Sequence, residues 1–145
     1  MTGDRIEKQI VLQAPRWKVW QALTDATQFA AWFGVEVEGE FSPGAQVWAV
    51  SSHPGYEGRF EMHILEMVTG RRFSWRWHPG VPGRDYSAEP MTLVVFELED
   101  EGEGTLLKVV ESGFDALPAA RRVPARDLNE RGWAAQLKAI ERYVG

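Results

Sequence analysis

The feature that most restricts the fold of this chain is an alternation of large apolar and polar side chains over residues 71–78. Phe73, Trp75 and Trp77 occupy every second position, with arginine or serine between them. Because successive side chains of a strand point to opposite faces, this pattern predicts a β-strand with one buried and one solvated face. Antiparallel sheets commonly have two such faces, so the pattern favours an antiparallel sheet.

Similar apolar alternation and turn-forming residues predict six further strands, which gives seven in total. They are expected at residues 5–12, 35–41, 46–51, 57–68, 91–99 and 105–112. In the fourth of these the pattern slips by one position at Ile64–Leu65, which predicts a bulge or a bend. The glycine- and proline-rich segment 79–90 is expected to be a loop, long enough to form the rim or lid of a site.

Helices are predicted at both sides of this run of strands. After the first strand, one short helix begins near Pro15, and Asp25 is expected to cap a second in a capping box with Gln28, before that helix ends at Gly34. The longest helix is expected at residues 125–143 and would span roughly 28 Å. This order of elements predicts an α+β fold, in which a curved seven-stranded antiparallel sheet wraps around the C-terminal helix and leaves a space between them.

The length of 145 residues fits a single domain over residues 1–145, and the composition limits its function. The sequence has no cysteine, which excludes a disulfide framework, a thiolate metal site and a cysteine nucleophile, and fits a cytoplasmic location. A net charge of −5 without a basic stripe argues against nucleic-acid and membrane partners. The first residues lack the apolar region of a signal peptide, and no apolar stretch is long enough to span a bilayer.

No motif for a metal, a cofactor or a catalytic nucleophile is visible. His53, His63 and His78 are far apart and form no HExxH pair, so no metal site is expected. The glycines form no GxGxxG or Walker pattern at the start of a helix, so no phosphate-bearing cofactor is expected. A GxSxG nucleophile elbow is missing, while a Ser–His–Asp triad is recognised by geometry and stays open. We therefore assign no catalytic residue, metal or cofactor.

Glu111 is the strongest candidate for a polar residue of the site. Counting by two from Thr105 places Leu107, Val109 and Glu111 on one face of a strand. If this face is turned to the core, Glu111 points into the covered space, where a carboxylate is costly unless it is paired. It would then orient a polar group of a ligand or act as a general base. Alternatively, the end of the strand is exposed and Glu111 caps a loop, and both interpretations stay open.

Aromatic residues make up 12% of the sequence, including seven Trp and seven Phe. Each buries about 150–250 Å², so such a set can either fill a core or line a large pocket. Trp32 and Trp48 are expected near the entrance of such a pocket, and Tyr86 on its rim. The candidate ligand-binding residues are Trp32, Trp48, Phe60, Met62, Phe73, Trp75, Trp77, Phe96, Glu111, Trp133 and Leu137.

Short motifs follow one another in a fixed order through nearly the whole chain. They are Ala14–Pro15, Val19–Trp20, Ala22–Asp25, Trp32–Phe33, Tyr56–Phe60, Phe73–Trp77, Thr105, Glu111–Phe114, Gly132–Trp133, Leu137 and Tyr143. With this order and spacing the sequence resembles the family of activator-of-heat-shock-chaperone-ATPase homologues, within the helix-grip superfamily (START-like, birch-pollen-allergen-like). The resemblance implies a hydrophobic cavity between sheet and helix. It implies no single activity, because relatives include lipid and hormone carriers, polyketide cyclases and co-chaperone domains.

Three functions follow as hypotheses. The first is non-enzymatic binding of a small hydrophobic or aromatic molecule between the sheet and the C-terminal helix. The second is a cyclase- or hydrolase-like enzyme for an aromatic or polyketide-type substrate, which would use Glu111 with partners among Tyr56, Arg76 and His78. The third is a protein-interaction module with a chaperone partner or a homodimer, for which the sequence offers only the glutamates at 36, 38 and 40. The separate N-terminal domain of eukaryotic co-chaperones is not expected, which argues against chaperone activation.

Overall fold

The predicted strands form one antiparallel sheet of seven strands, in the order β1-β7-β6-β5-β4-β3-β2. The computed structural model describes residues 4–145, so the first part of the segment considered for a signal peptide lies outside the described residues. The strands are β1 (Arg5–Leu12), β2 (Val35–Glu38), β3 (Gln46–Ser51), β4 (Gly58–Val68), β5 (Arg72–Trp77), β6 (Thr92–Glu101) and β7 (Gly104–Ser112). The helices are α1 (Arg16–Thr24), α2 (Ala26–Phe33) and α3 (Ala119–Val144), with the 3-10 helix η1 at Phe114–Ala116.

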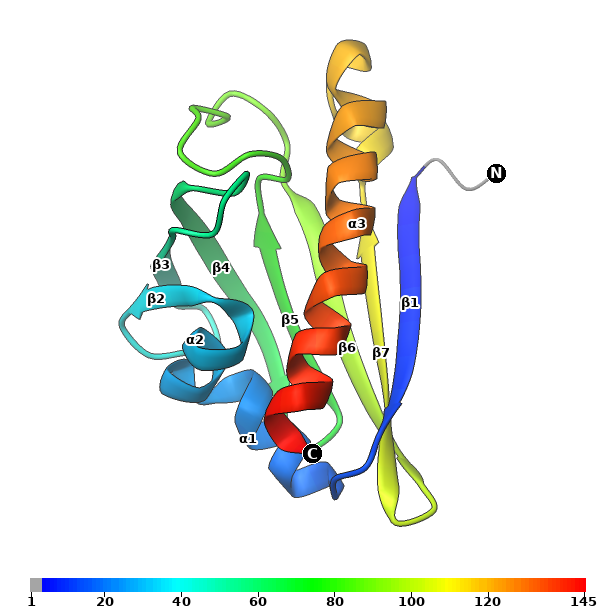
Figure 1. Cartoon of the computed structure of the whole chain (residues 1–145). Coiled ribbons are helices and arrows are strands. Elements are labelled where there is room, and N and C mark those ends of the chain that lie inside the picture. The colour runs from blue at the N-terminus through cyan, green and yellow to red at the C-terminus, as the bar shows by residue number, and fades with distance from the viewer. Residues whose placement is uncertain (1–3) are drawn as a thin grey trace.

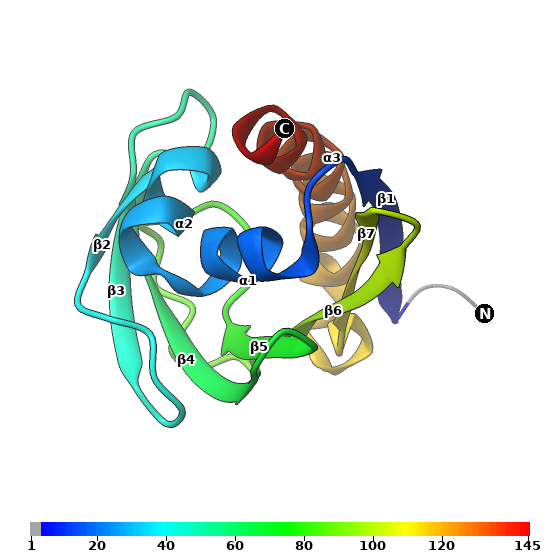
Figure 2. The ribbon, with the colours of Figure 1, turned by 90° about the horizontal axis from the view of Figure 1, so that it is seen from below.

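The sheet curls around the helices on its concave side. Figure 1 shows α3 running in front of the sheet, and Figure 2, seen from below, shows α1 and α2 inside the curve with α3 closing it. Alternate residues of β7 are buried from Thr105 to Glu111, which confirms that one face of this strand belongs to the core. The structure thus confirms the predicted α+β helix-grip fold.

The short helix α2 begins and ends where the sequence predicts, but Gln28 does not complete the capping box, because the backbone N–H of Asp25 donates to Gln21 O (2.9 Å). The side chain of Asp25 accepts hydrogen bonds from the backbone N–H groups of Thr27 (2.9 Å) and Gln28 (3.2 Å), so Asp25 is the N-cap. Gly34 ends the helix with a φ of 82°, in the left-handed region that favours glycine. These two ends set the direction of α2, whose apolar side then faces the core.

The helix α3 begins at Ala119 and not at residue 125. The prediction placed the start after Pro124 because proline lacks the N–H group that a helix interior needs. In the structure Pro124 lies inside the helix, in its second turn, and the helix continues on both sides of it. The added turn brings Arg121 into the helix. No helix of the described residues, α3 included, is long and apolar enough to cross a membrane.

The strand β2 is shorter than predicted and ends at Glu38. Gly39 has a φ of 113°, which is outside the range of a strand and ends the pairing with β3. Phe41 is nevertheless buried, with its ring centroid 5.2 Å from that of Phe29.

The predicted irregularity in β4 is confirmed. The register of β4 against β5 shifts between Ile64 and Met67. Within this bulge the backbone N–H of Glu66 donates to the hydroxyl of Ser74 at 3.2 Å. This contact explains why Ser74 is buried although it lies on the face of β5 that was expected to be solvated.

Part of the aromatic set forms a solid core near α1 and α2. Phe29, Phe73, Trp75 and Phe96 are fully buried. The ring centroid of Trp75 lies 5.9 Å from Phe29, 5.4 Å from Phe73 and 5.5 Å from Phe96. Tilted and edge-on contacts at these separations are favourable. These four rings therefore fill the core rather than line a pocket.

Candidate ligand-binding site

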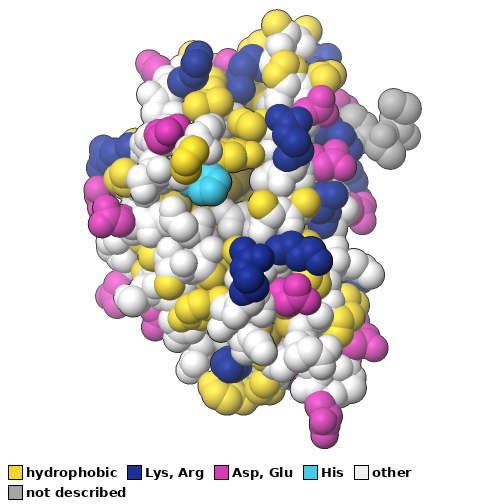
Figure 3. All heavy atoms as spheres, in the orientation of Figure 1, with side chains coloured by type: hydrophobic (Ala, Val, Ile, Leu, Met, Phe, Trp, Pro, Cys, Tyr) yellow, Lys and Arg dark blue, Asp and Glu magenta, His cyan; other side chains and the backbone are white. Residues whose placement is uncertain are grey.

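A cavity of about 460 Å³ lies between the sheet, α2, α3 and the loop that joins β5 to β6. Figure 3 shows this face of the molecule hollowed between α3 and the loops, with apolar side chains around the hollow and a histidine at its edge. The lining residues fall within segments 32–35, 48–61, 77–87 and 129–142. The volume is within the range of roughly 300–1,000 Å³ that small-molecule sites occupy.

Four aromatic rings form the apolar wall of the cavity. The ring centroids of Phe33 and Trp133 are 6.1 Å apart, those of Trp77 and Trp133 are 5.9 Å apart, and those of Phe60 and Trp77 are 5.7 Å apart. The rings come from α2, β4, β5 and α3, and all four line the cavity. Phe33, Phe60 and Trp77 remain only partly buried, because the cavity takes the place of further side-chain packing.

Behind this wall lies Glu111, which is fully buried. Its Oε1 accepts hydrogen bonds from Trp133 Nε1 (2.9 Å) and Asn129 Nδ2 (2.9 Å). Its Oε2 accepts from Thr92 Oγ1 (2.6 Å), Trp77 Nε1 (2.9 Å) and Asn129 Nδ2 (3.1 Å). Trp77 and Thr92 pair directly across β5 and β6. Asn129 and Trp133 share one side of α3, because residues four apart are neighbours on a helix. The sheet and α3 thus bring these donors to one carboxylate.

The Glu111 carboxylate has no free position for chemistry. A carboxylate offers about four lone-pair positions, and Glu111 accepts five hydrogen bonds from protein side chains. It also lies behind the cavity and not on its surface. The interpretation of Glu111 as a loop cap at an exposed strand end is therefore wrong. Of the partners considered for a catalytic Glu111, Tyr56 and His78 line the cavity, whereas Arg76 is exposed elsewhere.

The loop between β5 and β6 forms part of the rim, and Arg121 of α3 holds it. The Arg121 guanidinium donates to Pro79 O (2.8 Å) and Glu89 Oε1 (2.9 Å), near the two ends of the loop. Its central carbon lies 3.9 Å from the centroid of the Tyr86 ring, a cation–π contact. Farther along the loop, the N–H of Gly83 donates to a carbonyl of β4 at 3.1 Å. The rim is therefore attached to both α3 and the sheet.

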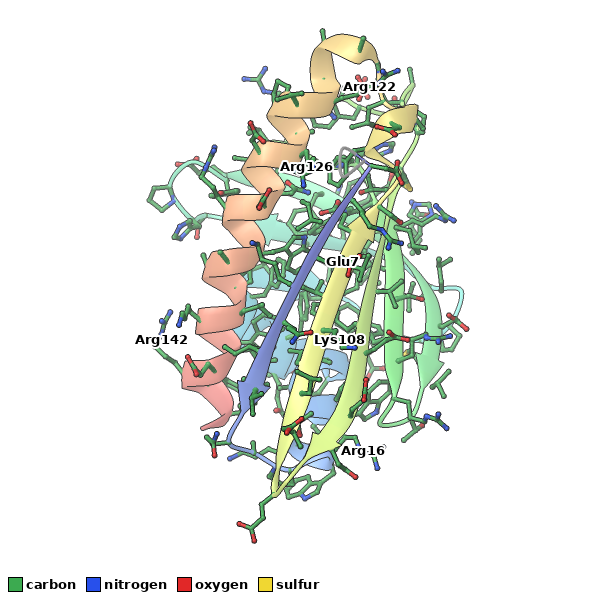
Figure 4. All side chains as sticks on the ribbon, turned by 90° about the vertical axis from the view of Figure 1, so that its right-hand side faces the viewer. Glu7, Arg16, Lys108, Arg122, Arg126 and Arg142 are labelled. Atoms are coloured by element: carbon green, nitrogen blue, oxygen red, sulfur yellow. The ribbon has the colours of Figure 1, made fainter. Side chains whose placement is uncertain are left out.

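The residues that line the cavity include more cationic than anionic side chains. The arginines are Arg59, Arg84 and Arg142, and the acidic residues are Glu61 and Asp85. Figure 4 shows Arg142 on the side of α3 that faces away from β1. The hydroxyl and then the backbone N–H of Ser87, which donate to Asp85, lower the pKa of that carboxyl below its ordinary value, so it stays ionised at neutral pH. Among residues 4–145, no group of three or more His, Asp or Glu could hold a metal ion.

The structure separates the candidate ligand-binding residues into two groups. Those that line the cavity are Trp32, Trp48, Phe60, Trp77 and Trp133. Those buried in the core or behind the cavity wall are Met62, Phe73, Trp75, Phe96, Glu111 and Leu137. Trp48 borders the cavity from its edge, since the neighbouring Val47 and Ala49 point into the core and Arg59 lies over the Trp48 ring at 4.0 Å.

Several lining residues of α3 were not among the predicted ligand-binding residues, although Gly132 belongs to the Gly132–Trp133 motif. Asn129, Gly132 and Gln136 lie beside Trp133 and line the cavity. Their spacing of three and seven residues, next to a tryptophan of the apolar stripe, is the signal that would have found them. Gly132 leaves space, because a Cβ atom placed there would meet only the Tyr56 hydroxyl, at 3.9 Å.

A curved antiparallel sheet that grips a long C-terminal helix, with an aromatic-walled cavity between them, defines a helix-grip protein of the START-like superfamily. Over residues 13–145 the sequence matches the family described as "Activator of Hsp90 ATPase homolog 1-like protein", and the chain belongs to this family. Comparison with curated proteins gives no significant match.

Solved structures with this fold include a protein from a biosynthetic locus and an Aha1 dimer. DynU16, from the dynemicin biosynthetic locus, is 25% identical with a TM-score of 0.74, and the match covers 97% of this chain and 46% of that one, less than half its length. Protein MLL2253 from Mesorhizobium loti is 18% identical with a TM-score of 0.78, covering 96% and 95% of the two chains. The Aha1 dimer from Colwellia psychrerythraea is 16% identical with a TM-score of 0.77, covering 97% and 95%. Because their sequence identities are low, MLL2253 and the Aha1 dimer show only that the fold is shared.

Proposed function

We propose that this protein binds a small hydrophobic, aromatic molecule in the cavity between the sheet and α3, without chemically changing it. The observation that carries the proposal is the cavity of about 460 Å³, walled by indole rings whose N–H groups are bonded to Glu111 behind them. The apolar ring faces are thus left for a ligand. Burial of apolar surface, worth about 25 cal/mol per Å², would drive the binding.

The wall is held in place before a ligand arrives, which favours binding because little ordering is then required. Trp77 and Trp133 are each fixed by the Glu111 carboxylate at 2.9 Å. The biosynthetic-locus neighbour is compatible with a role in handling small molecules. A cytoplasmic location is part of the proposal, and the absence of cysteine supports it.

Neither of the other hypotheses has a specific observation in its favour. Catalysis by Glu111 would need a free lone pair on its carboxylate, and protein donors occupy both oxygens. A chaperone partner or a homodimer rests on the name of the family and on that of one structural neighbour that shares 16% identity. We therefore propose neither.

The substitution Gly132→Leu tests the location of the ligand. Leucine favours a helix more than glycine does, and its side chain would extend into the cavity, where a Cβ meets only the Tyr56 hydroxyl at 3.9 Å. We expect the variant to fold and to lose at least about tenfold in affinity for aromatic compounds that bind the wild type, a loss of roughly 1.4 kcal/mol. Affinity is measured by calorimetry, after a thermal-shift screen of small aromatic compounds.

The matched control is Ala134→Leu, on the exposed side of the same helix. It adds a similar side chain outside the cavity and should leave the affinity unchanged. If Gly132→Leu binds as tightly as Ala134→Leu, the ligand does not occupy the cavity. If no aromatic compound shifts the melting temperature of the wild-type protein, the proposed function is wrong.

A further inference from the structure

Several side chains that line the cavity direct their N–H groups into the protein. The indole nitrogen of Trp32 donates to a backbone carbonyl of α1 at 2.7 Å. Those of Trp77 and Trp133 donate to Glu111 at 2.9 Å each. The amide nitrogen of Gln136 donates to the last carbonyl of α2 at 3.0 Å. A ligand in the cavity therefore meets the faces of these indole rings and not their donors.

Asn129 follows the same pattern, and its partner determines which way its amide points. Asn129 Nδ2 donates to both oxygens of Glu111, at 2.9 and 3.1 Å. These oxygens act as acceptors, since they also bind the N–H groups of Trp77 and Trp133, which can only donate. If the amide were reversed, its oxygen would face the Glu111 oxygens without a hydrogen atom between them. The Oδ1 atom of Asn129 must therefore point away from Glu111.

The Oδ1 atom is available to a ligand. It accepts no hydrogen bond from residues 4–145. It is also absent from the buried side-chain atoms that have no partner, so it is not fully buried. Since Asn129 lines the cavity, a molecule in the cavity can reach this oxygen. The α3 wall thus offers an acceptor beside the ring faces of Trp77 and Trp133.

We infer that the ligand is an aromatic molecule with a hydroxyl or N–H group, which donates a hydrogen bond to Asn129 Oδ1 while the ring lies against Trp77 and Trp133. This inference rests on the proposed function and adds the polarity of the ligand. A ligand of the same shape that only accepts hydrogen bonds would cover Oδ1 without satisfying it. Removing an acceptor from water without giving it a partner weakens binding.

Two other polar groups of the cavity help to define the test. Gln136 also keeps an amide oxygen, but it lies seven residues along α3, roughly 10 Å from Asn129 along the helix axis. A molecule of two fused rings that contacts Asn129 would not reach it with the same group. The Tyr56 hydroxyl can both donate and accept, so it does not favour either kind of ligand.

Two pairs of compounds test the inference, because each pair differs in one donor. They are 2-naphthol with 2-methoxynaphthalene, and indole with 1-methylindole. We expect the donor to bind the wild type about three- to tenfold more tightly than its methylated partner, as measured by calorimetry. In Asn129→Leu this ratio should fall to about one. Leucine also removes the bond to Glu111, so the absolute affinities will change, but the ratio within a pair isolates the donor contact.

The matched control is Gln136→Leu, which should keep the preference for the donor. Equal affinities within each pair for the wild type overturn the inference and leave binding in the cavity intact. A preference that survives in Asn129→Leu and disappears in Gln136→Leu also overturns it, because the acceptor is then the other amide. If no aromatic compound binds at all, both the inference and the proposed function are wrong.

Discussion

Glu111 is the one charged side chain that is fully buried among residues 4–145. A buried carboxylate is usually matched by a cation, but this one is surrounded by neutral donors from Trp77, Thr92, Asn129 and Trp133. Two of these donors belong to the indole rings of the cavity wall. Glu111 is therefore a positioning residue, whose effect on a ligand passes through the rings that it holds.

The substitution Glu111→Gln tests this role. The new amide group keeps one acceptor oxygen but places N–H groups opposite other donors, so some of the present hydrogen bonds are lost in a buried site. We expect the free energy of unfolding to fall by about 2–4 kcal/mol, since bonds to a buried charged group are individually strong. Chemical denaturation measures this change. The tryptophan emission of the folded variant should also shift, because Trp77 and Trp133 bond to different oxygens of Glu111 and only one oxygen remains.

Glu7→Gln is the matched control for this substitution. Figure 4 shows Glu7 on β1, and its ion pair with Arg5 is exposed, so its loss should change the free energy of unfolding by less than about 0.5 kcal/mol. If both substitutions have the same small effect, Glu111 does not hold the wall.

At the scale of elements, α3 contributes to the site in two places, at the rim and at the wall of the cavity. Its first turns carry Arg121, which holds the loop between β5 and β6 at Pro79 and Glu89. Its central turns carry Asn129 and Trp133, which face the cavity and Glu111. Because one rigid helix carries both groups, the rim and the wall of the cavity keep a fixed relation to each other.

The substitution Arg121→Lys should loosen the rim. Lysine keeps the positive charge but lacks the planar group that bonds to two loop oxygens and stacks on Tyr86. The backbone N–H of Gly83 donates to Arg59 O of β4, and that of Glu89 donates to Tyr86 O within the loop. We expect both amides to exchange with solvent roughly five- to tenfold faster in the variant. Hydrogen exchange followed by mass spectrometry or NMR measures these rates.

The neighbouring Arg122 supplies the control for the rim. It donates to Leu117 O, outside the loop, so Arg122→Lys should leave exchange in residues 79–90 unchanged. Equal exchange in the two variants would show that Arg121 does not restrain the loop.

For the whole molecule, the central property is the division of the aromatic rings between core and cavity. Phe73, Trp75 and Phe96 are fully buried, and the Trp75 ring makes tilted contacts with the other two rings. Phe60 and Trp77 border the cavity and are only partly buried. The first group should contribute mainly to stability, and the second should matter more for ligand binding.

Two alanine substitutions separate these contributions. Phe96→Ala removes a ring from the solid core and should lower the free energy of unfolding by about 3–5 kcal/mol. Phe60→Ala removes a ring that already borders empty space, so we expect a smaller loss, about 1–2 kcal/mol, together with weaker binding of aromatic compounds. Denaturation without ligand measures both. Equal losses of stability would mean that the space beside Phe60 is packed like the core.

The local features of this fold could be predicted because they depend on neighbours in the sequence. The alternation at residues 71–78 determines which face of β5 is buried, Asp25 caps α2 by bonding to the next residues, and the slip at Ile64 reflects the bulge. The start of α3 was predicted too late because Pro124 is a local signal against a helix, and the surrounding helix overrides it.

The sequence by itself determined the seven strands, the order of the helices and the resemblance to a cavity-bearing family. Only the tertiary structure decided which rings fill the core, which border the cavity, and that Glu111 binds donors from Trp77, Thr92, Asn129 and Trp133. The physical reason is that a period of two or of 3.6 residues determines the direction of a side chain within its element. The space between the sheet and α3 depends on the curvature of all seven strands together, which no local pattern contains.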